Sequence, residues 1–209
     1  MPFSRDQFFA VFAQYNAEMW PMPIAGYVIG LLAVGLLFWE SRASAIMIPT
    51  LLAALWIANG AGYHAIYFAQ INPLGPVFAT LFLGVSPLVY GDMNFRLRRD
   101  ARTVVALGLV GFAMVIYPLW GVLVGHLYPA VPVFGSAPCP TTIFTIGILL
   151  LADWTAARWL MVVPGIWAMI GGSAAILLGV PQDWGLLVAL AMIVVFAIGR
   201  LRDAAFARH

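Results

Sequence analysis

The single cysteine of this chain lies in its most unusual stretch. Cys139 stands between two prolines in residues 125–142, a segment that holds four prolines and no charged residue. Thr141 and Thr142 follow it, where an apolar run begins, so the cysteine is expected at the start of a helix. A helix N-terminus favours the thiolate, which is the form that binds soft metals or acts as a nucleophile. The alternative is a small apolar side chain in a tight turn.

Two histidines accompany long apolar segments. His64 belongs to a polar stripe with Asn59, Tyr63 and Tyr67 at helical spacing. Lipid cannot satisfy such a stripe, so it must face other helices or a water-filled cavity. His126 follows the end of another apolar segment. Each histidine could ligate a metal or haem, relay protons, or hydrogen-bond across helices.

Composition limits the class of protein. The 209 residues are 64% hydrophobic and 9% charged, whereas soluble domains carry about 25% charged residues. The bilayer must therefore be the solvent for most of the chain. A net charge of +2 with no basic face argues against nucleic acid as a partner. We find no nucleotide loop, no Ser/His/Asp arrangement and no paired carboxylates, so no residue is assigned a catalytic role.

The first 23 residues predict an amphipathic helix that lies in the membrane interface. Ser4 and Gln7 have the spacing of a capping box. Aromatic residues recur every three or four positions over residues 4–18, and prolines at 21 and 23 end the pattern.

Seven apolar segments follow within residues 24–199 and predict an all-α transmembrane domain. They cover residues 24–39, 44–70, 74–90, 103–125, 141–152, 159–179 and 184–199. Residues 200–209 form a basic tail. Alternating connections would place nine arginines on one side of the membrane and only Arg5 on the other. Positive residues favour the inner side, which predicts seven spans with the N-terminus outside, the C-terminus in the cytoplasm and the aromatic belts at both interfaces.

The fifth segment is too short to cross the membrane. Its twelve residues give about 18 Å of helix, against a hydrocarbon core of about 30 Å. Either the proline-rich stretch before it enters the bilayer or the helix begins earlier. A short, proline-interrupted segment of this kind is a pointer to a membrane binding site. His64 is expected at the same depth as Cys139, which directs attention to this pair.

Carboxylates are scarce in the apolar segments. Glu40, Asp92 and Asp153 all fall at segment boundaries, and residues 181–183 read as a short polar connection. The sequence therefore disfavours a proton- or sodium-coupled carrier with a buried acid.

Two blocks of sequence carry a resemblance to a known family. They are PFSRDQFFAVFAQYNAEMWP at residues 2–21 and HLYPAVPVFGSAPCPTTIFTIG at residues 126–147. Together they resemble an uncharacterised bacterial family of small multi-pass inner-membrane proteins, classed as a domain of unknown function. The resemblance implies the class and the location, and it transfers no functional residue.

These observations favour a binding or transport protein with an outward-facing pocket. In the sharpest hypothesis, a soft metal ion is bound by Cys139 and His64, with His126 as a further ligand. The other predicted pocket residues are Tyr63, Tyr67, Tyr128, Thr142 and Asn59. The first alternative is a b-type haem electron carrier with His64 and His126 as axial ligands. The second is an accessory membrane subunit without a ligand, in which the polar stripe only packs helices.

Overall fold

The computed structural model describes residues 2–85 and 93–206, and within this part the protein is built from helices without a β-strand. The all-α prediction is confirmed. Large apolar side chains cover the sides of the bundle, and several of them are more than half exposed: Leu31, Val104, Leu123, Trp159 and Ile176. A surface of this kind suits a lipid environment better than water.

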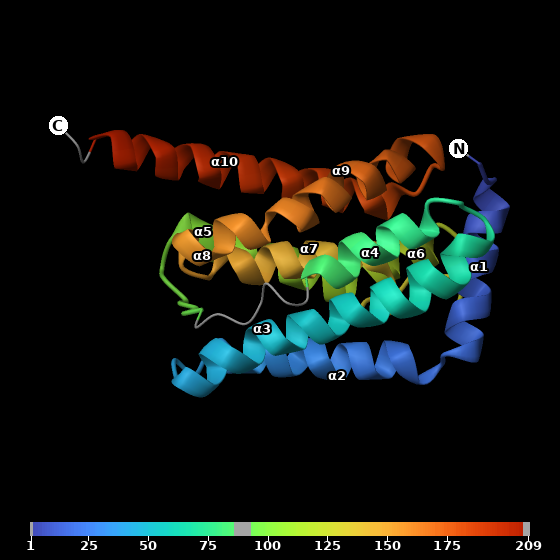
Figure 1. Cartoon of the computed structure of the whole chain (residues 1–209), viewed down its shortest axis with the longest axis horizontal. Coiled ribbons are helices and arrows are strands. Elements are labelled where there is room, and N and C mark those ends of the chain that lie inside the picture. The colour runs from blue at the N-terminus through green and yellow to red at the C-terminus, as the bar shows by residue number, and fades with distance from the viewer. Residues whose placement is uncertain (1, 86–92, 207–209) are drawn as a thin grey trace.

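The first helix, α1 (Arg5–Glu18), lies across one end of the bundle (Figure 1). Its axis makes an angle of 85° with that of the next helix, α2 (Pro21–Leu36). The predicted capping box is present, because the Ser4 side chain accepts from the Gln7 backbone N–H and the Gln7 side chain accepts from that of Ser4. The aromatic face of α1 is buried against the other helices.

Within the described residues, each of the predicted apolar segments corresponds to a helical run; residues 86–90 of the segment predicted at 74–90 lie outside them. The remaining elements are α3 (Arg42–Ile57) with η1 (Ala58–Tyr67) and η2 (Phe68–Gln70), α4 (Gly75–Val85), α5 (Ala101–Gly111) with η4 (Phe112–Ile116) and α6 (Tyr117–Leu123), α7 (Pro138–Leu150), α8 (Trp154–Leu160) with α9 (Val162–Leu177), and η5 (Pro181–Asp183) with α10 (Trp184–Phe206). By length and composition, three of the described helical runs could cross a membrane, or up to five if each bent pair is one span.

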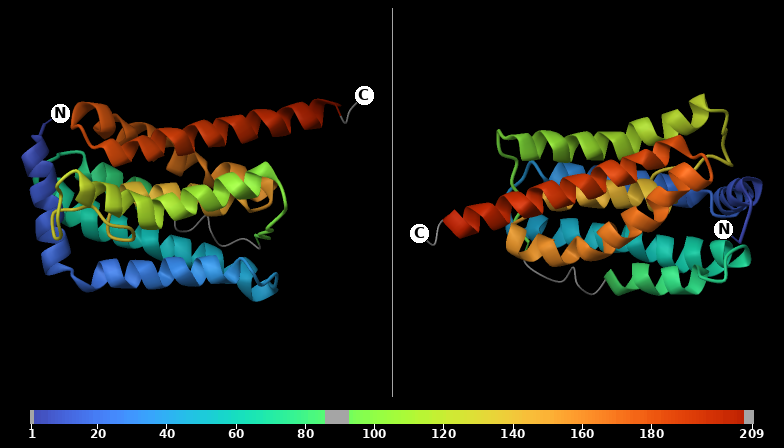
Figure 2. Two further views of the ribbon diagram at one scale, coloured as in Figure 1. Left: turned by 180° about the vertical axis from the view of Figure 1, so that it is seen from behind. Right: turned by 90° about the horizontal axis from the view of Figure 1, so that it is seen from above.

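Successive runs pass back and forth between the two ends of the bundle (Figure 2). The connections before α4, α7 and α10 lie at the end that α1 covers. The starts of α3, α5 and α8 and the C-terminal end of α10 lie at the opposite end.

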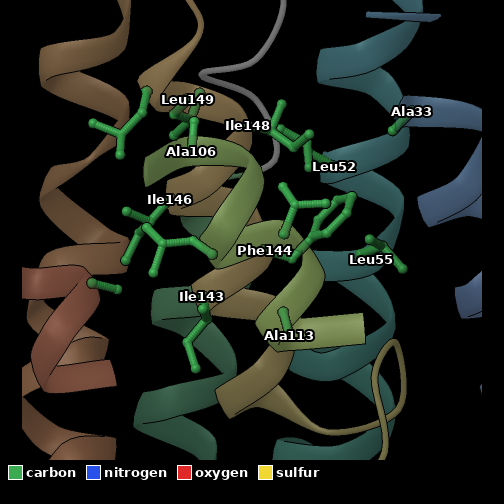
Figure 3. Packing of buried hydrophobic residues seen from close by; sticks show 14 of the residues in the cluster. Ala33, Leu52, Leu55, Ala106, Ala113, Ile143, Phe144, Ile146, Ile148 and Leu149 are labelled. Atoms are coloured by element: carbon green, nitrogen blue, oxygen red, sulfur yellow. The ribbon is translucent and has the colours of Figure 1, made fainter. Parts of the chain in front are cut away.

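Helix α7 is the centre of the bundle. All thirteen of its residues are buried, and it contacts α3, α5, α9 and α10. Figure 3 shows Phe144 and Ile148 directed toward Leu52 and Leu55 of α3. The helix begins at Pro138, three residues before the predicted start, and ends at Leu150, two residues before the predicted end, so it stays short. A helix enclosed by protein need not match the thickness of the lipid, so α7 can be short.

The proline-rich segment before α7 is folded into the bundle. Two asparagines hold its backbone: the Asn16 amide donates to the carbonyls of Pro129 (2.8 Å) and Val131 (3.0 Å), and the Asn59 amide donates to that of Gly135 (3.1 Å). Gly135 also touches Gly26 of α2 so closely that a Cβ on Gly26 would lie 2.5 Å from the Gly135 Cα. The segment is therefore tied to three helices.

Replacing Asn16 by alanine should lower the stability of the protein by about 3 kcal/mol. The side chain is fully buried, donates two hydrogen bonds and accepts a third from the Ser136 hydroxyl (3.0 Å), and each loss should cost about 1 kcal/mol or more. Thermal unfolding in detergent measures the effect. Gln14→Ala is the control, because Gln14 lies on the same helix and makes one exposed hydrogen bond to Glu18. Equal melting temperatures for the two variants would contradict this role of Asn16.

Candidate functional site: an aromatic cavity and a buried carboxyl group

A small cavity lies beneath α1, between η1, α4, α7 and α9. Its volume is about 120 Å³, close to that of an engineered apolar cavity of about 150 Å³ that binds benzene. Its wall is mostly apolar, with Cys139 and Asn72 among the lining residues. The aromatic residues that line it are Phe3, Phe8, Phe12, Tyr63, Phe68, Phe78 and Trp167.

Two hydrogen-bond donors of this wall have no partner within the described residues. They are the Tyr63 hydroxyl and the Trp167 indole N–H. The Tyr63 ring is held between Phe12 (centroids 4.8 Å apart) and Phe68 (5.6 Å), with both rings nearly parallel to it. An unpartnered buried donor is costly. Both atoms are covered by protein, and Trp167 lies beside the Cys139 thiol, so a bound acceptor would reach these donors only after neighbouring side chains shift.

Cys139 is buried at the start of α7 and lines the same cavity. Its thiol lies beside Asp183, Trp167 and Tyr117. The predicted position of Cys139 at a helix start is confirmed. The structure adds that its surroundings include a carboxyl group.

Asp183 is that carboxyl group, and the sequence analysis missed it. The side chain is fully buried, Oδ1 accepts from the Tyr117 hydroxyl at 2.6 Å, and Oδ2 has no partner within the described residues. Gln182 is equally buried, and both ends of its amide lack partners there. The expectation that the apolar part of the chain holds no buried acid was wrong, because η5 folds into the bundle and buries Asp183. Tyr117 was the available signal, since a tyrosine within an apolar segment usually finds a partner for its hydroxyl.

His64 is adjacent to the cavity and does not line it. Its ring packs against Phe82 (centroids 4.5 Å apart) and Trp167 (4.8 Å). Nδ1 lies 3.1 Å from the Asn59 backbone oxygen, and Nε2 has no partner within the described part of the chain. His64 therefore contacts Trp167, which lines the cavity, without lining the cavity itself.

Three other predicted pocket residues contact α1 instead. His126 stacks on Phe9 with ring centroids 3.7 Å apart. The Tyr128 hydroxyl donates to the Asn16 backbone oxygen, and the Tyr67 hydroxyl donates to the Glu18 carboxylate, both at 2.8 Å. Hydrogen bonds from Gln14 and Tyr67 lower the pKa of exposed Glu18 below its usual value. These contacts hold α1 in place across the bundle.

The last two predicted residues are buried in the bundle. Asn59 binds the proline-rich segment, and Thr142 lies one turn after Cys139 with a hydroxyl that has no partner among the described residues. The structure thus brings Tyr63 and Cys139 to one cavity. It places His64, Asn59 and Thr142 in the surrounding core and His126, Tyr67 and Tyr128 against α1.

Among the described residues, no group of three or more His, Cys, Asp or Glu side chains could hold a metal ion. The soft-metal and haem hypotheses stay predictions without an observation that favours them.

The fold and the cavity define an all-helical, membrane-compatible protein with a small internal site. The chain belongs to DUF6064, a family of unknown function whose model matches residues 5–208. The resemblance found in the sequence is confirmed at the level of the family. No curated protein and no solved structure matches the chain.

Replacing Tyr117 by phenylalanine should lower the stability by about 1–3 kcal/mol, because it removes the hydrogen bond to the buried Asp183 carboxyl. Tyr128→Phe is the control, because that hydroxyl belongs to a residue that is 56% exposed and can bond to water. Thermal unfolding of both variants in the same detergent measures the difference. A Tyr117→Phe protein as stable as the control would show that the Tyr117–Asp183 hydrogen bond is unimportant.

Proposed function

We propose that this protein spans the membrane seven times, with its N-terminus outside, and binds a small, mainly apolar molecule in the aromatic cavity at its outer end. The cavity carries the proposal. It is partly open and lined by aromatic rings, and the donors of Tyr63 and Trp167 in its wall have no partner within the described residues. Both features suit a compact ligand, such as a single aromatic ring with one hydrogen-bond acceptor.

The distribution of arginines supports the proposed orientation. Arg42 and Arg200 belong to the ends of α3 and α10 that lie away from α1, and the arginine cluster before α5 lies at the same end of the bundle. Arg158 lies in the last turn of the short helix α8, which begins at that end. Among the described residues, Arg5, on α1, is the one arginine at the α1 end. An asymmetry of this size favours the arginine-rich end inside the cell. Helix α1 and the cavity would then face outward.

Labelling of engineered cysteines tests the orientation. Cys139 is the only native cysteine and is buried, so it contributes little background. Asp6→Cys and Glu40→Cys replace exposed acidic residues at the two ends. A membrane-impermeant maleimide applied to intact cells should label the first variant and leave the second unlabelled until the cells are opened. The reverse pattern would refute the proposed orientation.

The size of the cavity restricts the ligand. A volume of about 120 Å³ suits one small ring or a short hydrocarbon chain. The apolar wall supplies most of the affinity, and the two donors determine how an acceptor is oriented. Binding is the part of the sequence-based hypothesis that the cavity supports, and transport stays a prediction.

Two nearly isosteric probes test this mode of binding. Benzonitrile carries a hydrogen-bond acceptor, and phenylacetylene has the same shape without a comparable acceptor. Calorimetric titration of the purified protein should show saturable binding of both, with benzonitrile about tenfold tighter because one hydrogen bond contributes about 1.4 kcal/mol. Tyr63→Phe should reduce this preference.

A variant that fills the cavity provides the decisive control. Ala174 lines the cavity and Ala65 is exposed on η1. Ala174→Leu should abolish binding of both probes, and Ala65→Leu should leave it unchanged. The proposal fails if wild-type protein shows no saturable binding, or if Ala174→Leu binds the probes as well as Ala65→Leu does.

A further inference from the structure

A second cavity lies at the end of the bundle opposite α1. Its volume is about 290 Å³, and its lining includes Arg96, Arg98, Arg102 and Arg200. Asp100 and Asp153 are also in the lining, so the charged groups sum to +2. The cavity is more than twice the volume of the aromatic cavity and has the opposite chemical character.

Backbone pairing gives this cavity a defined wall. Phe95 pairs with Ala152, the Arg96 N–H donates to the Leu151 carbonyl at 3.0 Å, and the Asp153 N–H donates to the Asn94 carbonyl at 3.0 Å. The segment that carries Arg96 and Arg98 is thereby fixed to the C-terminal end of α7. Because the backbone of these two arginines is held in place, less conformational entropy is lost when their side chains gather around one ligand.

Arg102 offers a hydrogen-bond donor that the described residues do not use. Its Nη2 donates to the Ala152 carbonyl at 2.7 Å, which holds the guanidinium in place. Its Nε is buried and has no partner in the described part of the chain. An arginine held in this way by a protein carbonyl presents a pre-oriented guanidinium group, whose fork of N–H donors is suited to an anionic oxygen.

The aspartates do not neutralise this group of arginines. Oδ1 of Asp100 accepts from the Thr103 N–H at 2.9 Å and caps α5, and that hydrogen bond lowers the pKa of Asp100. Within the described residues, none of the four arginines has a carboxylate oxygen within 4.0 Å. A net positive charge therefore remains in the cavity for a ligand.

We propose that this cavity binds a phosphate group. Each planar guanidinium group can donate two parallel hydrogen bonds to phosphate oxygens. A positive surface charge without this geometry would not provide them. In a membrane, the group would be the phosphate of an anionic lipid headgroup, and in solution it would be a free phosphate. This proposal is independent of the aromatic cavity at the other end.

Binding to the purified, full-length protein in a neutral detergent tests the proposal. One series adds inorganic phosphate, and a parallel series adds a short-chain phosphatidylglycerol. An uncharged short-chain diacylglycerol is the comparison for the lipid. Saturable binding of phosphate itself identifies a free-phosphate site. Binding of the anionic lipid without binding of inorganic phosphate identifies a lipid site.

Three variants determine whether the binding belongs to the cavity. Arg98→Gln and Arg200→Gln should each weaken the binding about tenfold, the loss expected for one charged hydrogen bond of about 1.4 kcal/mol. Arg158→Gln should have no effect, because this guanidinium lies over the Trp159 ring, 5.2 Å from its centroid, and outside the cavity. The proposal is overturned if neither ligand binds, or if Arg158→Gln weakens binding as much as the other two variants.

Discussion

The partly to fully buried backbone of residues 129–137 is the constraint on which the α1 end of this protein depends. A backbone inside the bundle needs partners for its carbonyl groups, because neither water nor lipid is there to provide them. Asn16 and Asn59 supply those partners from α1 and η1. The same bonds hold α1 across the bundle and fix the point where α7 begins, so one set of hydrogen bonds positions three elements.

The aromatic cavity is a consequence of this arrangement. Phe8 and Phe12 come from α1, Cys139 from the start of α7, and Tyr63 from the helix that also carries Asn59. None of these elements encloses a space alone, and the asparagine bonds set the distance between them. Any movement of α1 would change the volume of the cavity, so the hydrogen bonds of Asn16 couple the stability of the fold to ligand binding.

Local features of the sequence were predictable and tertiary ones were not. The capping box at Ser4 and the apolar runs are local patterns, and the structure has helices at those places. The 85° angle between α1 and α2 depends on contacts with distant residues, which explains why His126 and Tyr128 contact α1 instead of lining the predicted pocket. Asp183 was missed for the same reason: its partner, Tyr117, is 66 residues away in the sequence.

The buried polar atoms that lack partners indicate where this sequence has retained costly groups. In the described part of the chain, the side chains concerned at the α1 end include Tyr63, Thr142, Trp167, Gln182 and Asp183, and one such residue at the other end is Arg102. Native proteins satisfy most buried polar atoms, so an unsatisfied group needs an explanation such as a ligand or bound water. The core of α7 between the two ends is filled by apolar side chains. Three of these residues line a cavity: Tyr63 and Trp167 at the α1 end and Arg102 at the other end. Unsatisfied groups at a cavity are expected where stability has been exchanged for binding.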